Sequence, residues 1–324
     1  MSTLIIYVME INIQEGNIYY LDTLPNVILS SISDDSIVVK LSVFEEQVYE
    51  GRFVKDFNNS ISFDIYPIIE SFLQKPCPPI PNGDVPAFAL ATNLILSCSI
   101  EAGNLIRTFI FKGMNSSVAD RVSNITGIRV PKNYIPILSA TFNNSWKFIE
   151  FRTATGMIIS REVLQSFDGD QQSVLIGSFK LPNYFGALHV VFSGDGTTAP
   201  EGPIYRVCAE DFEQYAFSNE FGGYDNIPMS GILEFSPKVE FQNIVTGKYL
   251  KAGSTKSIKE WKQNSGFLTK DTMEEVLKLI CGKDSYHLSN GEWRQIVITD
   301  CNISHKSTDS LHSLTFTYRY ADEI

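Results

Sequence analysis

Short runs in which apolar and polar residues alternate most restrict how this chain can fold. In the run 37–43, isoleucine, valine and leucine occupy every second position, with Lys40 and Ser42 between them. Successive side chains of a strand point to opposite faces of a sheet, so this period of two predicts a half-buried strand. The same period returns at 61–65 and at 314–320. These runs predict stacked sheets and not a helical bundle.

Further apolar runs are rich in β-branched and aromatic residues and are separated by turn residues such as those at 167–170 and 193–196. Short strands between such turns predict antiparallel sandwiches or barrels. We therefore expect a mainly β protein with β-sandwich-like domains and a C-terminal α+β module. The additional strands are expected at 94–100, 105–111, 146–151, 157–160, 173–179, 188–192 and 232–241.

Two stretches have helical spacing. A short helix is expected over 67–74, and a longer one after Thr269, which is a suitable N-cap residue. Asp271 favours the first turn of the longer helix, and Gly282 can close it. The pair Asn290–Gly291 then predicts a hairpin between two strands. The apolar face of the longer helix comprises Met273, Val276, Leu277 and Ile280.

A length of 324 residues suggests two or three domains. We expect an N-terminal β-sandwich-like domain at 1–130, a middle one at 131–230 and the α+β domain at 231–324. The proline-rich loop 75–86 and the polar stretch 114–127 are candidate arms for contact with a neighbouring subunit, because proline removes backbone donors and disfavours regular structure.

The chain is acidic, with a formal net charge of −11 and a pI of about 4.9. Phosphate backbones repel such a chain, so sequence-specific nucleic-acid binding is not expected. The lysine-rich stretch 248–262 predicts a solvated face, with a local anionic partner as the alternative. No apolar run reaches the roughly 18 residues of a membrane span, and no signal-peptide pattern is present. We expect synthesis in the cytoplasm without export by the usual route.

No residue pattern predicts catalysis or a bound cofactor. The cysteines are odd in number, widely spaced and without a CxxC pair, which favours buried thiols over disulfides. Cys301, His305 and His312 match no standard zinc spacing. The Asp-Gly turns at 168–170 and 194–196 lack a full set of calcium ligands. We therefore expect no metal, no cofactor and no enzymatic activity. The five cysteines are Cys77, Cys98, Cys208, Cys281 and Cys301.

Two glycines stand between two aromatic residues in the stretch Asn219–Asp225. Gly222 and Gly223 can adopt positive φ angles without a Cβ penalty, and Asp225 adds turn chemistry. A tight turn at the junction of two structural units is the favoured interpretation, and a ligand platform is the alternative. The expected junction residues are Asn219, Phe221, Gly222, Gly223, Tyr224 and Asp225.

This stretch resembles a junction in tail and virion structural proteins of phages and prophages of Bacteroidetes, including crAss-like phages. The similarity continues through 264–269, 290–293, 298–300 and 313–318, and it covers about 205–322. It implies a virion component that acts by assembling, and it implies no catalytic residues. The expected core of the C-terminal module comprises Phe267, Val276, Leu277, Trp293 and Phe316.

The resemblance implies a tail, tail-hub or neck subunit of a bacteriophage that forms a homo-oligomeric ring and contacts other tail or neck proteins. The alternative is a receptor- or glycan-binding β-sandwich module, which an exposed Trp146, Trp261 or Trp293 would support because aromatic rings stack on sugars. A glycan-degrading tail enzyme is a third hypothesis. Closed rings require repeated head-to-tail contacts between copies.

Overall fold

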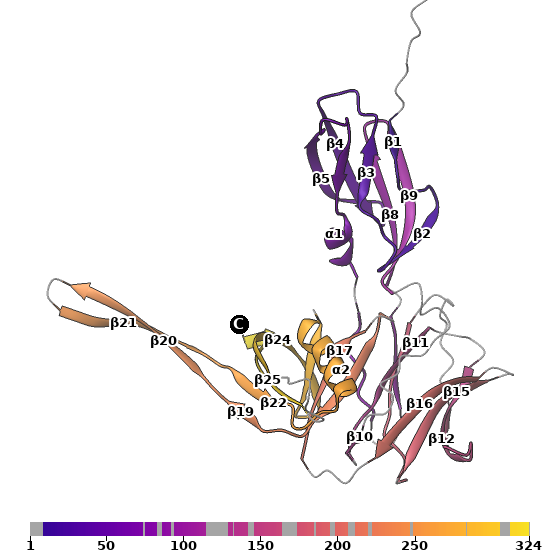
Figure 1. Ribbon diagram of the computed structural model, residues 1–324, viewed down its shortest axis with the longest axis vertical. Coiled ribbons are helices and arrows are strands. Elements are labelled where there is room, and N and C mark those ends of the chain that lie inside the picture. The colour runs from indigo at the N-terminus through magenta and orange to yellow at the C-terminus, as the bar shows by residue number, and fades with distance from the viewer. Residues whose placement is uncertain are drawn as a thin grey trace, which may run out of the picture.

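Among the residues that it describes, the computed structural model is mostly β with few helical residues, which confirms the expected fold class. The described residues form six sheets, grouped below into three units (Figure 1). The description covers residues 9–73, 75–82, 86–91, 94–114, 129–131, 133–141, 146–163, 174–184, 186–194, 198–206, 211–219, 222–246, 249–282, 284–304 and 312–323.

Two sheets packed face to face form the N-terminal unit, residues 9–73 and 94–114. The smaller sheet has the order β1 (Glu10–Ile11), β3 (Val27–Ser30) and β6 (Ile61–Phe63). The larger sheet has the order β2 (Asn17–Tyr20), β9 (Leu105–Lys112), β8 (Ile95–Ala102), β4 (Ser36–Val43) and β5 (Glu46–Val54). Leu29 of the smaller sheet and Leu41 and Phe109 of the larger one belong to a single buried cluster. The predicted alternation holds in β4, where Val39, Leu41 and Val43 are all buried.

A short helix closes this unit. Helix α1 (Tyr66–Glu70) begins with Pro67 in its first turn, where a missing N–H costs nothing. It is shorter than the expected span of 67–74, because Ser71 already caps its C-terminus. Its buried residue Ile69 packs into the N-terminal core.

The chain enters the middle unit earlier than expected. Strand β7 (Ala87–Ala91) leaves the N-terminal unit and pairs with β14, after which the chain returns to form β8. The first sheet of the middle unit has the order β11 (Ile137–Thr141), β14 (Val174–Ser178) and β7. The second has the order β10 (Arg129–Val130), β16 (Thr198–Arg206), β15 (Ala187–Gly194), β12 (Trp146–Thr153) and β13 (Ile158–Val163). Leu175 and Phe151 join the two sheets in one core.

A buried carboxylate in the middle unit predicts sensitivity to acid. Burial alone would raise the pKa of Glu150, but hydrogen bonds from Arg152 and Arg161 outweigh it and hold the pKa below its ordinary value of 4.5. The resulting stability is complete above that value and is lost as pH falls through the lower, folded pKa. In acid unfolding, Glu150→Gln should remove this part of the pH dependence, whereas Glu292→Gln at an exposed position should not. Equal acid slopes for wild type and Glu150→Gln would contradict the assignment.

A seven-stranded sheet forms the C-terminal unit, residues 211–323. Its order is β18 (Tyr224–Met229), β17 (Glu213–Ser218), β23 (Ser285–Ser289), β24 (Glu292–Ser304), β25 (Ser313–Tyr320), β22 (Trp261–Asn264) and β19 (Leu233–Phe235). The boundary expected at 230 falls inside this sheet, because β17 and β18 precede it and pair onward to β23. Asn290 and Gly291 connect β23 and β24 with positive φ angles of 54° and 82°, as the sequence predicted.

Helix α2 (Lys270–Cys281) lies on one face of this sheet. A short 3-10 helix, η3 (Ala321–Glu323), follows β25 at the C-terminal end of the unit. The Thr269 hydroxyl accepts a hydrogen bond from the Thr272 N–H, which confirms the predicted N-cap. Gly282 has φ −71° and ψ 149°, so extended backbone and not a left-handed residue ends the helix. Met273, Val276 and Leu279 are buried against the sheet.

The three units share a central layer. Strand β14 is buried along its whole length, because β11–β14–β7 is covered on both faces. Ile176 faces Ala216 and Tyr224 of the C-terminal sheet, and Trp293 and Leu94 join the same cluster. The middle sheet is therefore the part of the molecule to which both other units attach.

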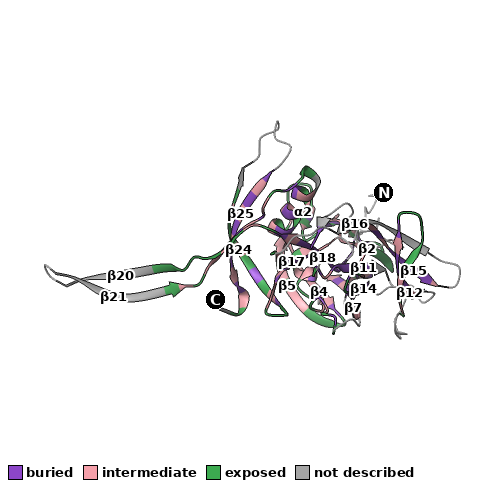
Figure 2. Ribbon diagram, turned by 90° about the horizontal axis from the view of Figure 1, so that it is seen from below, coloured by how far each residue is buried: buried purple, intermediate pink, exposed green. Residues whose placement is uncertain are grey.

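A long two-stranded hairpin extends from the C-terminal sheet (Figures 1 and 2). We call it the arm; it consists of β20 (Lys238–Thr246) and β21 (Tyr249–Ile258). The sequence predicted one strand over 232–241, but Pro237 cannot donate to a ladder and separates β19 from β20. The terminal strand predicted over 314–320 is β25, which lies between β24 and β22.

The described part of the proline-rich loop, 75–82, contacts its own chain. The Ser178 hydroxyl donates to the Pro79 carbonyl at 2.7 Å, and Lys75 lies 3.9 Å from Asp284. The Cys77 thiol lies 3.9 Å from the Trp293 carbonyl oxygen. This part of the loop therefore joins units of one chain, while residues 115–127 of the other candidate contact segment lie outside the described residues.

Candidate functional site

The stretch Asn219–Asp225 forms the tight turn between β17 and β18. The Asn219 side chain donates to Asp225 Oδ1 at 2.9 Å and accepts from the Gly223 N–H at 3.1 Å. Backbone bonds from Asn219 to Gly223 and from Gly222 to Asn219 complete the turn. The turn lies within the C-terminal sheet and not between the middle and final regions. Phe221 lies outside the described residues.

Close backbone approach explains both glycines. Gly222 has φ +77°, and a Cβ there would lie 2.7 Å from the Gly113 carbonyl oxygen. A Cβ at Gly223 would lie 2.0 Å from the Ser139 hydroxyl oxygen. That hydroxyl bridges the backbone of Tyr224, accepting from its N–H at 2.8 Å and donating to its carbonyl at 3.0 Å. The turn is thus where the C-terminal unit meets both other units.

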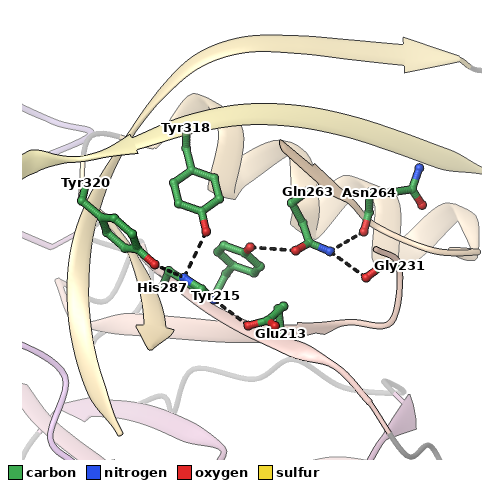
Figure 3. A network of polar contacts seen from close by, with 8 residues as sticks. All are labelled: Glu213, Tyr215, Gly231, Gln263, Asn264, His287, Tyr318 and Tyr320. Carbon is green, nitrogen blue, oxygen red and sulfur yellow. Dashed lines mark hydrogen bonds and ion pairs between the residues drawn. The ribbon is translucent and has the colours of Figure 1, made fainter. Parts of the chain in front are cut away.

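Below the turn, a polar network crosses the C-terminal sheet (Figure 3). His287 of β23 contacts Glu213 of β17 through Nε2 at 2.7 Å and the Tyr320 hydroxyl of β25 through Nδ1 at 2.8 Å. The Tyr318 hydroxyl also reaches Nδ1, at 3.1 Å. A carboxylate only accepts, so in the neutral ring Nε2 carries the proton and Nδ1 accepts from tyrosine.

The second half of the network holds the root of the arm (Figure 3). The Tyr215 hydroxyl donates to Gln263 Oε1 at 2.9 Å, and Gln263 Nε2 donates to the Gly231 carbonyl at 3.1 Å. Gln263 belongs to β22, and Gly231 lies two residues before the start of β19. Because the arm connects β19 to β22, this buried amide ties together the two segments from which the arm emerges.

This network resembles a catalytic relay in its residue types, but not in its setting. His287 is only 2% exposed, and both of its ring nitrogens are engaged. Burial raises the pKa of Tyr318, with the neighbouring Tyr320 adding to the effect, so its hydroxyl stays protonated at neutral pH. A buried group whose hydrogen bonds are satisfied stabilises one arrangement of strands. The network thus connects side chains of four strands, β17, β22, β23 and β25, through hydrogen bonds.

An exposed apolar surface lies beside the root of the arm. Phe267 is 82% exposed and Ile232 is 72% exposed, and both line a groove of about 480 Å³ with Glu234 and Lys262. The prediction that Phe267 is a core residue is wrong. Leu268 forms an isolated bridge with His312 and takes the buried position, so its extended neighbour faces outward.

The other predicted core residues are distributed over two clusters. Val276 and Phe316 are buried in the C-terminal core. Trp293 is also buried, but it lies on the opposite face of the sheet, in the cluster shared with the middle unit. Leu277 is only half-buried, because the turn of the helix places Leu279 in the core instead. Sequence spacing could identify the apolar residues but not the face of the sheet that each covers.

A polar cleft of about 500 Å³ separates α1 from the turn, and its lining includes Asn219. Tyr66 donates to Glu70 at 2.9 Å there, and burial together with this carboxylate raises the pKa of Tyr66 to about 12. Burial lowers the pKa of Lys75, although the carboxylate of Asp284 opposes the effect. The cleft therefore marks the contact between the N-terminal and C-terminal units.

Two tryptophans can be assessed against the glycan hypothesis. Trp293 is buried, and the ring of Trp261 packs against Phe235, Tyr318 and Tyr320 at centroid distances of 5.4, 6.1 and 4.6 Å. Neither provides an isolated stacking platform. Nothing is described of the side chain of Trp146.

The described residues contain no group of three or more histidine, cysteine, aspartate or glutamate side chains able to hold a metal ion. Cys301 and His312 are described, whereas His305 is not. No helix in the same residues has the length and hydropathy needed to cross a bilayer.

Comparisons with known proteins supply no family. No protein-family model matches the chain, and no curated protein matches it. Among solved structures, one similar chain is surface layer protein SbsC, domains 4–9, with 8% sequence identity. The alignment covers 98% of this chain and 43% of that chain, so this chain spans less than half of its length. The TM-score of 0.19 is too low to show a shared fold.

Proposed function

We propose that this protein is a structural subunit of a bacteriophage virion, located in the tail, tail hub or neck, and that it assembles into a homo-oligomeric ring. Its role is assembly and not catalysis. The sequence resemblance over about 205–322 supports the virion assignment. The arm is the observation that carries the assembly role, because an extended hairpin that projects from its own unit is suited to contact another chain.

The exposed apolar side chains at the root of the arm also support assembly. Ile232 and Phe267 both line the groove, and Phe235 follows Ile232 by three residues. Each of these three side chains exposes more than half of its surface. Clustered exposed apolar side chains are typical of protein interaction sites. Polar Glu234 and Lys262 border them, as at the rim of an interface.

The mass of the purified protein in solution, measured with negative-stain images of the same sample, tests this function. Closed rings of one stoichiometry are the expected result. A protein that stays monomeric at every concentration, and also fails to form rings with the neighbouring tail or neck proteins, would contradict it. A glycan-binding screen on the same sample tests the receptor-binding alternative.

A further inference from the structure

The arm has two strand edges that no other strand in the described part of the chain covers. Its strands pair only with each other among the described residues. With nine and ten residues, they are long enough to extend about 30 Å from the body. A two-stranded hairpin is only marginally stable in water, and a third strand stabilises it. The arm is therefore suited to pair, through its free strand edges, with a strand of another chain in a complex.

The charge of the arm differs in sign from that of the rest of the protein. The stretch 238–258 contains four lysines and one glutamate, a formal charge of +3 within a chain of −11. The N-terminal unit, in contrast, contains twelve acidic and five basic residues. Complementary charge steers association between two protein surfaces. Nucleic acid is a poorer partner, because the acidic remainder of the protein repels phosphate.

One outer strand matches the arm in both length and charge. Strand β5 ends the larger N-terminal sheet, spans nine residues and pairs only with β4 among the described residues. Over 45–56 the four exposed acidic residues outnumber the two basic ones, Arg52 and Lys55; the acidic residues are Glu45, Glu46, Glu50 and Asp56. Val54, the last residue of β5, is 76% exposed and is available for apolar contacts. Phe44 and Phe57 add exposed rings nearby.

The other outer strands match less well. Strand β13 has six residues, and its Arg161 already pairs with Glu150. Strands β2 and β10 have only four and two residues, and β18 is buried. In Figure 1, β5 and the arm lie at different ends of the same molecule. An arm that reaches a β5 strand must therefore come from a second copy of the chain.

We infer that the arm of one copy adds to the edge of β5 in a second copy. Main-chain hydrogen bonds would extend the five-stranded sheet, and the net positive charge of the arm would complement the net negative charge around β5. The contact is head to tail, because it joins different surfaces of the two copies, and repetition closes a ring when the rotation permits. This inference rests on the proposed self-assembly and specifies its contact.

A charge-swap experiment on the full-length chain tests the contact. Glu46→Lys with Glu50→Lys, and separately Lys251→Glu with Lys256→Glu, should each reduce the multimeric fraction in mass photometry about tenfold or more. Combining all four substitutions should restore multimers. As a matched control, Glu10→Lys with Glu292→Lys makes the same charge change at exposed sites elsewhere and should leave assembly unchanged.

A second variant guards against misfolding. Lys238 and Ile258 are direct partners at the base of the arm, so Asn-Gly can replace 239–257 and close the shortened hairpin. This variant should remain folded by circular dichroism and be monomeric. The self-assembly hypothesis fails if wild type forms no multimers alone or with its tail or neck partners. If wild type assembles but the reversed-charge variants assemble equally well, or if the combined variant stays monomeric, the arm–β5 contact is wrong.

Discussion

Replacing Gly223 by alanine should destabilise the protein by about 4 kcal/mol, because the new methyl group has no space. Its carbon would lie 2.0 Å from Ser139 Oγ and 2.5 Å from Ser139 Cβ. Ser139 would have to move, and both of its hydrogen bonds to the Tyr224 backbone would break. Urea unfolding of the purified protein measures the loss.

Two comparison variants separate this clash from a general cost of replacing glycine. Gly156 has φ +85° with nothing near its missing Cβ, so Gly156→Ala should cost only about 1 kcal/mol. Adding Ser139→Gly to Gly223→Ala removes the clashing atoms. The double variant should therefore be about as stable as Ser139→Gly alone. Strictly additive losses would show that the two residues do not collide.

Replacing Gln263 by leucine should cost about 3 kcal/mol and should also loosen the root of the arm. The substitution leaves the Tyr215 hydroxyl without its acceptor and the Gly231 carbonyl without its donor in a buried site. Faster hydrogen exchange at the amides of β19 and β22 should accompany the loss of stability. If the arm mediates assembly, the multimeric fraction should fall as well.

Gln295 provides the matched control, because it is an exposed glutamine in the same sheet. Gln295→Leu should change stability by no more than about 0.5 kcal/mol. If Gln263→Leu proved equally mild and left exchange at β22 unchanged, the buried amide would not fasten the arm.

The sequence was most informative where short-range chemistry decides the structure. The alternation at 37–43 predicted β4, Thr269 predicted the start of α2, and Asn290–Gly291 predicted the hairpin between β23 and β24. Each depends on neighbours within a few residues. Local patterns of this kind are readable without knowledge of the fold.

Long-range pairing limited the rest of the prediction. Nothing local in β7 indicates that it leaves the N-terminal unit for β14. The positions of Phe267 and Trp293 depend on which face of the C-terminal sheet is covered, and the helix and the middle unit cover opposite faces. His287 and Glu213 are 74 residues apart, so their contact exists only after β17 and β23 have paired.

The candidate site was predicted only in part. The turn Asn219–Asp225 was located from its glycines, although its place within one sheet was not. The arm was missed, since 232–241 was expected to form a single strand and the lysines after it were interpreted as a solvated face. Pro237 was the local signal for a break, and the long runs on both sides of Gly247 were the signal for a hairpin.

The attachment of the arm has a mechanical consequence. Strands β20 and β21 continue the antiparallel pair β19 and β22, separated from it by two residues on each side. Tension applied at the tip would therefore run along β19 and β22. Hydrogen bonds in an antiparallel ladder are perpendicular to the strands, so such tension shears them together instead of opening them one by one. A subunit pulled through its arm would resist as a tether, whereas a sideways force could peel β19 from the edge of the sheet.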